Sequence, residues 1–130
     1  MAELLVPVSP GEVIDKLTIL RIKARRIVDA GKLEHVRREL ELLERTWRES
    51  AYAGRDIGAD EAALQAVNER LWDIEDRIRD KERSRSFDAA FVELARAVYV
   101  ENDQRAAIKR RINLALGSLI VEEKSYSQYR

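Results

Sequence analysis

The sequence predicts an all-α fold, an antiparallel helical bundle, and three observations support this prediction. Of the 130 residues, 45% are hydrophobic and 37% are charged, which is typical of helical bundles. Only five glycines and two prolines are present, too few for the many turns of a large sheet. Apolar residues recur at spacings of three and four along four long stretches, which is the helical period. A chain of this length is expected to form a single domain over residues 1–130.

The first helix is expected at about 10–29, and a specific start signal marks it. Ser9 can cap the helix, Pro10 suits its first position, and Glu12 can reach back to the cap. Gly31 is expected to end the helix in a left-handed conformation. Because apolar residues occur nearly all the way round this stretch, we expect a central helix that is contacted on several sides.

The second and third helices, expected at about 32–52 and 61–82, each carry a narrow apolar stripe. Such stripes are typical of a coiled-coil seam. A loop with Gly54 and Gly58 separates the two stretches, and Asp60 is expected to cap the third helix. We therefore expect these two helices to form a long, coiled-coil-like antiparallel hairpin.

The fourth helix is expected at about 88–116 and to end near Gly117. The capping oxygens of residues 84–88 precede it. Asn102 and Asp103 are poor residues for a helix interior, because their side chains compete for backbone hydrogen bonds. The sequence leaves two alternatives open: one continuous helix, or a restart capped by Asn102.

Polar residues interrupt the apolar stripe of the fourth helix. Steps of three and four from Val98 reach Asn102, Arg105 and Lys109 before apolar positions resume at Ile112. The first and third helices have comparable interruptions, so we expect these groups to meet in a partly buried polar seam. A buried charge costs several kcal/mol unless it is paired. The seam is therefore either a structural network or a site that a ligand completes. The candidate ligand-binding residues are Asp15, Lys16, Glu75, Asp76, Arg79, Asn102, Arg105 and Lys109.

Composition argues against several classes of function. The 24 basic residues balance the 24 acidic ones, so no net field attracts nucleic acid. The absence of cysteine excludes disulfides and thiol catalysis and agrees with the cytoplasmic location that we expect. No stretch is apolar enough for a membrane span, and the N-terminal residues do not resemble a signal peptide. His35 is the single histidine, and no metal-binding or phosphate-loop motif is present. We expect no cofactor, no metal and no catalytic residue.

Four segments cover nearly the whole chain: VSPGEVIDKLTIL at 8–20, NERLWDIEDRIRDKE at 68–82, FDAAFVELARAVYVENDQRAAIKRRIN at 87–113 and GSLIVEEKSY at 117–126. Taken together, these segments resemble a family of bacterial domains of unknown function. The resemblance implies a small protein, or a domain attached to tetratricopeptide-repeat or glycan-assembly proteins. It also implies a context of cell-surface polysaccharide assembly, by association. No catalytic or binding residue is carried over from that family.

The sequence favours a non-catalytic helical interaction module that forms a homodimer or binds a protein partner. Two helices have more apolar surface than one thin hairpin can cover, and a second copy would bury the remainder. The alternative is binding or hydrolysis of a phosphorylated or nucleotide-linked sugar. In that case Arg79, Arg105 and Lys109 would bind phosphate, and Asp15, Glu75 or Asp76 would orient hydroxyl groups or a metal.

Overall fold

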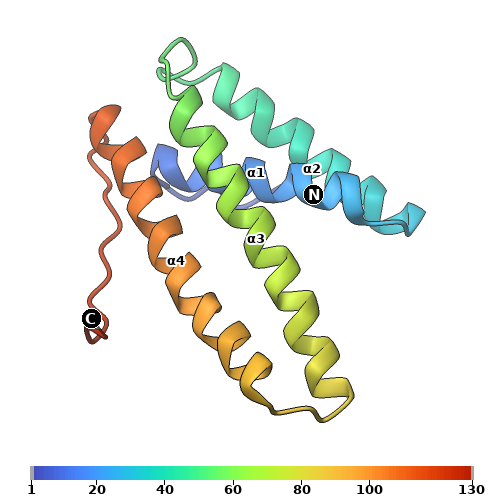
Figure 1. The fold of residues 1–130 in the computed structure, drawn as a ribbon. Coiled ribbons are helices and arrows are strands. Elements are labelled where there is room, and N and C mark those ends of the chain that lie inside the picture. Colours follow the sequence, from blue (N-terminus) through green and yellow to red (C-terminus); the bar gives the residue numbers. More distant parts are fainter. Residues whose placement is uncertain (1, 130) are drawn as a thin grey trace.

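The computed structural model describes residues 2–129, so Met1 and Arg130, the ends of the predicted domain, lie outside the described residues. It contains the helices α1 (Pro10–Arg26), α2 (Ala30–Arg48), α3 (Gly58–Arg83) and α4 (Ala89–Ala115). No strand occurs in the described part of the chain, which confirms the all-α prediction. α3 and α4 lie side by side as a long hairpin, α1 crosses the hairpin near its open end, and α2 folds back against α1 (Figure 1).

α1 is central, as predicted, because it packs on each of the other three helices. The Ser9 Oγ accepts a hydrogen bond from the Glu12 N–H at 3.2 Å, and Pro10 occupies the first helical position, so these two parts of the start signal are confirmed. The Glu12 carboxylate was expected to reach back to the cap, but it pairs with Lys109 of α4 instead. α1 ends at Arg26, three residues before the predicted end at residue 29, because the backbone adopts an extended conformation at Ile27. The expectation that Gly31 ends this helix is wrong.

Gly31 lies instead in the first turn of α2. Asp29 caps that helix, and its Oδ1 accepts a hydrogen bond from the Lys32 N–H at 2.8 Å. A strong cap therefore starts α2 two residues before the predicted boundary.

The long hairpin is formed by α3 and α4, and the predicted pairing of the second and third helices is wrong. α2 and α3 diverge from their connecting loop and do not pack on each other within the described residues (Figure 1). The apolar stripe of α2 turns to the core through Leu40, Leu43 and Trp47. Because α1 is apolar on several sides, it needs α2 as a cover on the side away from the hairpin.

α3 begins at Gly58, with Ile57 at the cap position and no side-chain cap. Asp60 was expected to cap this helix but lies within its first turn, where its carboxylate accepts a hydrogen bond from the Arg111 Nε at 3.1 Å. An acidic group in the first turn still favours the helix, because it faces the positive end of the helix dipole.

α4 is continuous from Ala89 to Ala115 and passes through Asn102 and Asp103 without a break, so the alternative of a restart is not realised. Asp88 caps the helix and accepts a hydrogen bond from the Phe91 N–H at 3.0 Å. The chain leaves α4 at Gly117, whose φ of 67° suits the left-handed end of a helix.

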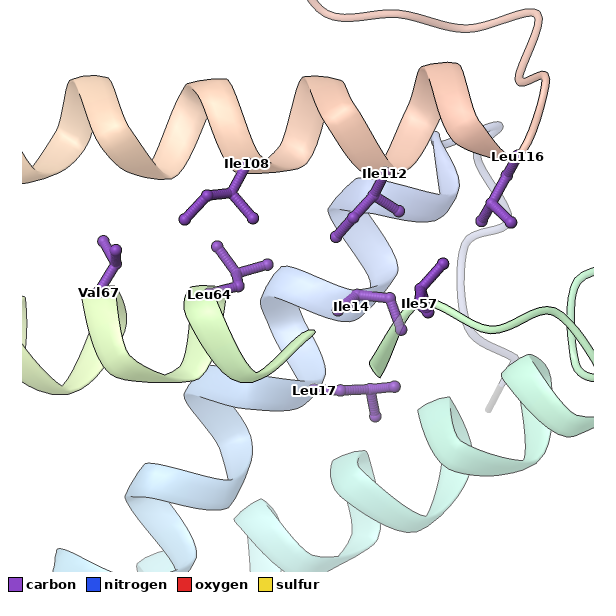
Figure 2. Close-up of a cluster of buried hydrophobic side chains, with 8 residues drawn as sticks. All are labelled: Ile14, Leu17, Ile57, Leu64, Val67, Ile108, Ile112 and Leu116. Atoms are coloured by element: carbon purple, nitrogen blue, oxygen red, sulfur yellow. The ribbon is translucent and has the colours of Figure 1, made fainter. Parts of the chain in front are cut away.

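The buried core lies at the open end of the hairpin. Figure 2 shows its side chains, which come from α1, α3, α4 and the residue before α3: Ile14, Leu17, Ile57, Leu64, Val67, Ile108, Ile112 and Leu116. By contrast, no residue between 69 and 107 is buried. This distal part of the hairpin, called the arm below, has no further layer of helix packed across it: Arg26 of α1 pairs with Asp73 at its base, and Tyr129 of the C-terminal segment packs edge-on against Tyr99. Its apolar side chains, such as Ile78 and Val98, are only half-buried.

None of the helices in residues 2–129 combines the length and the hydropathy that a membrane span requires.

Candidate functional site

Three of the predicted site residues meet where α1 crosses α4. Asp15 lies on α1 and is 1% exposed, while Arg105 and Lys109 lie one helical turn apart on α4 and are partly buried. The structure therefore contains a polar seam at the place that the interrupted stripe of α4 predicts. None of these three side chains points freely into solvent.

Asp15 is held by Arg105 and by Asn68 of α3. Its Oδ1 accepts hydrogen bonds from the Arg105 Nε and the Asn68 Nδ2, both at 2.9 Å, and its Oδ2 accepts one from the Arg105 Nη2. The Asn68 Nδ2 also donates to the Thr18 Oγ1 at 2.8 Å. We call Asp15, Thr18, Asn68 and Arg105 the Asp15 cluster. It joins α1, α3 and α4 through one fully buried carboxylate.

Asp15 and Arg105, the two ionisable members of the Asp15 cluster, are both charged at neutral pH. Burial alone would raise the pKa of Asp15, but the hydrogen bonds from Arg105 and Asn68, together with the nearby positive charges, outweigh burial and lower this pKa. The hydrogen bond to Asp15 raises the pKa of Arg105 and outweighs the opposite effect of burial. Both partners therefore keep their charges, and the bidentate contact compensates the desolvation of the carboxylate.

Lys109 is surrounded by carboxylates. Its Nζ lies 2.6 Å from the Glu12 Oε2, 3.4 Å from the Glu122 Oε2 and 3.9 Å from the Asp15 Oδ2. Burial lowers the pKa of Lys109, but these carboxylates outweigh it and raise the pKa. Glu122 belongs to the C-terminal segment, which runs back along α4 (Figure 1). Lys109 thus ties this segment to the start of α1.

A second buried amide fixes the start of α1 on α4. The Gly11 N–H donates to the Asn113 Oδ1 at 2.7 Å, and Asn113 is 1% exposed. A Cβ atom at Gly11 would lie 2.6 Å from the Lys109 backbone oxygen, so the close approach requires glycine. Asn68 and Asn113 are absent from the predicted site. The sequence offers only a weak indication that these two asparagines are buried, namely that each directly follows a core residue in its helix.

An open groove of about 530 Å³ lies beside the Asp15 cluster, between α3, α4 and one residue of α1. We call it the polar groove. Its walls contain five predicted site residues together with an aromatic ring, two apolar side chains and Asn68: Ile19, Asn68, Leu71, Trp72, Glu75, Asp76, Arg79, Asn102 and Arg105. Arg105 therefore contacts Asp15 on one side and lines the groove on the other.

Three of the predicted site residues do not line the polar groove: Asp15, which is buried beside it, and Lys16 and Lys109. Lys16 follows Asp15 directly but is exposed, because the next residue of a helix points about 100° away from the buried face. Lys109 lies one turn further along α4 than Arg105, where it pairs with Glu12 and Glu122. Within residues 2–129, no group of three or more His, Asp or Glu side chains is arranged to hold a metal ion.

Comparison with protein families gives one match. The model of the Family of unknown function (DUF6165) matches residues 4–129. The chain belongs to this family. Nothing among the curated proteins or the solved structures matches the chain. Membership in DUF6165 confirms the resemblance to an uncharacterised domain family, and it assigns no activity, ligand or partner.

Proposed function

We propose that this DUF6165 chain acts as one domain, a non-catalytic helical interaction module that self-associates through its arm. The observation that supports the proposal is that the buried residues of the hairpin occur only at its open end and not in the arm. The apolar stripes of α3 and α4 continue through the arm, yet no residue from 69 to 107 is buried. Two helices alone cannot shield both of their apolar faces, so a second layer is needed to cover them.

One face of the arm has the shape to receive another helix pair. A shallow groove of about 790 Å³ runs between α3 and α4 on this face, which we call the apolar groove. Ile74 and Leu94 supply branched apolar groups, and Ala90 and Ala97 leave room for close approach. The complete lining is Ile74, Arg77, Asp80, Lys81, Ser84, Ala90, Glu93, Leu94 and Ala97.

The charges beside the apolar groove favour a second copy of this chain as its occupant. Arg77 and Lys81 lie on the α3 side, together with Asp80, whose carboxylate pairs with Arg83. Glu93 lies on the α4 side. Lys81 and Glu93 also have intramolecular partners, Asp88 and Arg96, so Arg77 is the basic group that is available to pair with Glu93 of a second copy. A two-fold axis parallel to the hairpin would place α3 of one copy against α4 of the other, so that Glu93 faces Arg77 and Lys81. The result is a four-helix bundle with Ile74 and Leu94 in its centre. The formal net charge of zero adds no long-range repulsion between copies.

Sedimentation velocity tests this proposal. The wild-type chain should be dimeric at about 50 µM, in the range expected for a modest interface. Leu94→Lys should be monomeric because it places a charge in the centre of the interface, whereas Val92→Lys, on the exposed opposite side of α4, should remain dimeric. A monomeric wild-type chain at this concentration would show that the proposal is wrong.

A charge exchange tests the arrangement of the two copies. Arg77→Glu should weaken the dimer, because it brings like charges together across the interface, and a second change, Glu93→Arg, should restore it. If the double variant dimerises no better than Arg77→Glu alone, the parallel two-fold arrangement is wrong even where the wild-type chain is dimeric.

The other functional expectations remain predictions from the sequence. The expected functional link to the assembly of cell-surface polysaccharides rests only on the resemblance to the family. The expected cytoplasmic location rests on the amino-acid composition. Fractionation of cells that express the tagged chain tests the location.

The alternative function concerns the polar groove and Lys109. For a phosphorylated ligand, surplus positive charge would be expected. Instead, Arg105 is paired with Asp15, Lys109 with Glu12, and Arg79 with Glu75. This pairing favours a network that fixes the helices over a phosphate site, and it leaves self-association as the better-supported function.

A further inference from the structure

The polar groove has a charge balance that suits a neutral ligand. Its two guanidinium groups, from Arg79 and Arg105, are matched by the carboxylates of Glu75 and Asp76. Asp15, directly behind Arg105, adds one more negative charge. A phosphate group would enter a region without net positive charge, next to the carboxylates that already pair with both guanidinium groups. An uncharged ligand would meet no such barrier.

The hydrogen-bonding groups of the polar groove are of mixed type. Asp15 fixes the Nε and Nη2 of Arg105, while the Nη1 makes only a long contact of 3.5 Å to the Asn102 Oδ1. Donor capacity on Arg105 and on the Asn102 amide therefore remains for a ligand. Asp76 is exposed and makes no hydrogen bond within the described residues, and its charge interacts with Arg26 only at a distance, so its oxygens can accept hydrogen bonds from a ligand. Groups that both donate and accept, such as hydroxyls, match this set.

Apolar surface completes the polar groove. Trp72 contributes an indole ring, and Ile19 and Leu71 contribute aliphatic side chains. The guanidinium carbon of Arg26 lies 6.0 Å from the centre of the Trp72 ring and helps to hold it in place. A ligand for this groove thus needs a flat apolar face and polar groups at its edge. The groove volume lies within the range of sites for small molecules.

We propose that the polar groove binds a neutral carbohydrate ring. The C–H face of the ring packs on Trp72, and the hydroxyl groups at its edge bond to Asp76, Asn102 and Arg105. Asp15 acts as a positioning residue, because it sets the orientation of the Arg105 guanidinium. The site is independent of the proposed dimer: helical periodicity places Trp72, Asp76 and Arg79 on the side of α3 opposite to the side that lines the apolar groove.

Tryptophan fluorescence provides a direct test, because the chain has only two tryptophans. Trp47 stacks on Tyr52 away from the groove, so Trp47→Phe leaves Trp72 as the single reporter. The probes are the methyl glycosides of glucose, galactose, mannose and N-acetylglucosamine, with inorganic phosphate, glucose 1-phosphate and UDP-glucose for comparison. At least one neutral glycoside should change the Trp72 emission in a saturable way at millimolar concentration, and phosphate alone should not.

Two results would overturn the proposal. One is the absence of a saturable change with every neutral glycoside. The other is binding of a phosphorylated sugar more than about tenfold tighter than its neutral parent, since that would contradict the charge argument.

Matched variants test the residues in the Trp47→Phe background. Asp76→Asn should weaken binding at least about tenfold, because it removes the negative charge and one of the two acceptor oxygens that bond to the ligand. The melting temperature should not change, because Asp76 is exposed. Asp80→Asn, one turn further along α3 and outside the polar groove, should bind as the parent does. Equal effects of the two variants would contradict the assignment. Leu94→Lys, which should prevent dimerisation, should still bind the glycoside. The test of the dimer and the test of the carbohydrate site can therefore fail independently of each other.

Discussion

Asp15 and Arg105 form an ion pair whose carboxylate is fully buried. Such a pair adds little net stability compared with apolar side chains, because both charges must leave water. Removal of one partner is nevertheless costly, since it leaves the other without compensation. The pair therefore acts mainly as a constraint: α1 and α4 can pack in only one register if Asp15 is to meet Arg105.

Asp15→Asn should lower the free energy of unfolding by about 3 kcal/mol, because Arg105 would stay partly buried without a carboxylate. Urea unfolding followed by circular dichroism measures this change. The exposed Asp76→Asn serves as the matched control and should change the free energy by less than about 0.5 kcal/mol. Similar losses in the two variants would show that the buried pair has no special role.

The ion pair should also make stability depend on pH. The folded pKa of Asp15 lies below its ordinary value, so the contribution of this carboxylate is complete above the unfolded pKa of about 3.9 and is lost as pH falls through the folded pKa. The difference in unfolding free energy between wild type and Asp15→Asn should therefore shrink from pH 5 to pH 2.5. A constant difference over this range, measured by urea unfolding, would contradict this account.

Single-residue predictions from the sequence succeeded where helical periodicity alone decides the outcome. Steps of three and four from Val98 identified Asn102, Arg105 and Lys109 as side chains on an inward face of α4. Periodicity says nothing about which residue of another helix lies opposite. For that reason Asn68 and Glu12 could not be assigned as partners of Asp15 and Lys109, respectively.

At the scale of helices, Gly11 sets the closest approach between α1 and α4. The contact combines a backbone hydrogen bond to Asn113 with a space too small for a Cβ atom. A bulkier residue would force the two helices apart just where the Asp15 cluster begins.

Gly11→Ala should destabilise the chain by about 1–3 kcal/mol, because the added methyl group would meet the rigid backbone oxygen of Lys109. Gly54→Ala is the control: nothing lies within 4 Å of its Cβ position, so the change should be neutral or slightly stabilising. Thermal unfolding of the two variants makes the comparison. An unchanged melting temperature for Gly11→Ala would show that α1 can shift without cost.

The existence of each helix was predictable, but the pairing of the helices was not. The stripes of α2 and α3 have the same spacing, and equal stripes can pack on any apolar partner. Connection length gives the better guide: only residues 84–88 join α3 to α4, while residues 49–57 join α2 to α3. A short connection makes neighbouring antiparallel helices, and the longer one allowed α2 to turn toward α1.

At the scale of the whole molecule, composition predicted the fold class correctly, since it reflects all four helices together. Function was not predictable to the same extent. No metal, phosphate or nucleophile motif is present, and the relevant features are the uncovered arm and the two grooves. These depend on how much of the hairpin α1 covers, which no local pattern of residues reveals.

Amide hydrogen exchange should distinguish the well-packed open end of the hairpin from the arm. In monomeric Leu94→Lys, amides of the arm should exchange faster than those of the buried residues around Ile14 and Ile112, because few packed side chains hold the arm closed. In the wild-type chain at dimerising concentration, the arm should become protected. Uniform protection of the monomeric variant would contradict the division.

The crossing of α1 over the hairpin has a mechanical consequence. The buried side chains of α3 and α4 lie at Asn68 or nearer the open end of the hairpin, so the rest of the two helices extends beyond this fulcrum as a lever. From Asn68 to Arg83 the rise is about 23 Å, and a tilt of only about 5° at the fulcrum would displace the tip by about 2 Å. A small change in the angle at which α1 crosses the hairpin would therefore move the tip of the arm much farther than its base.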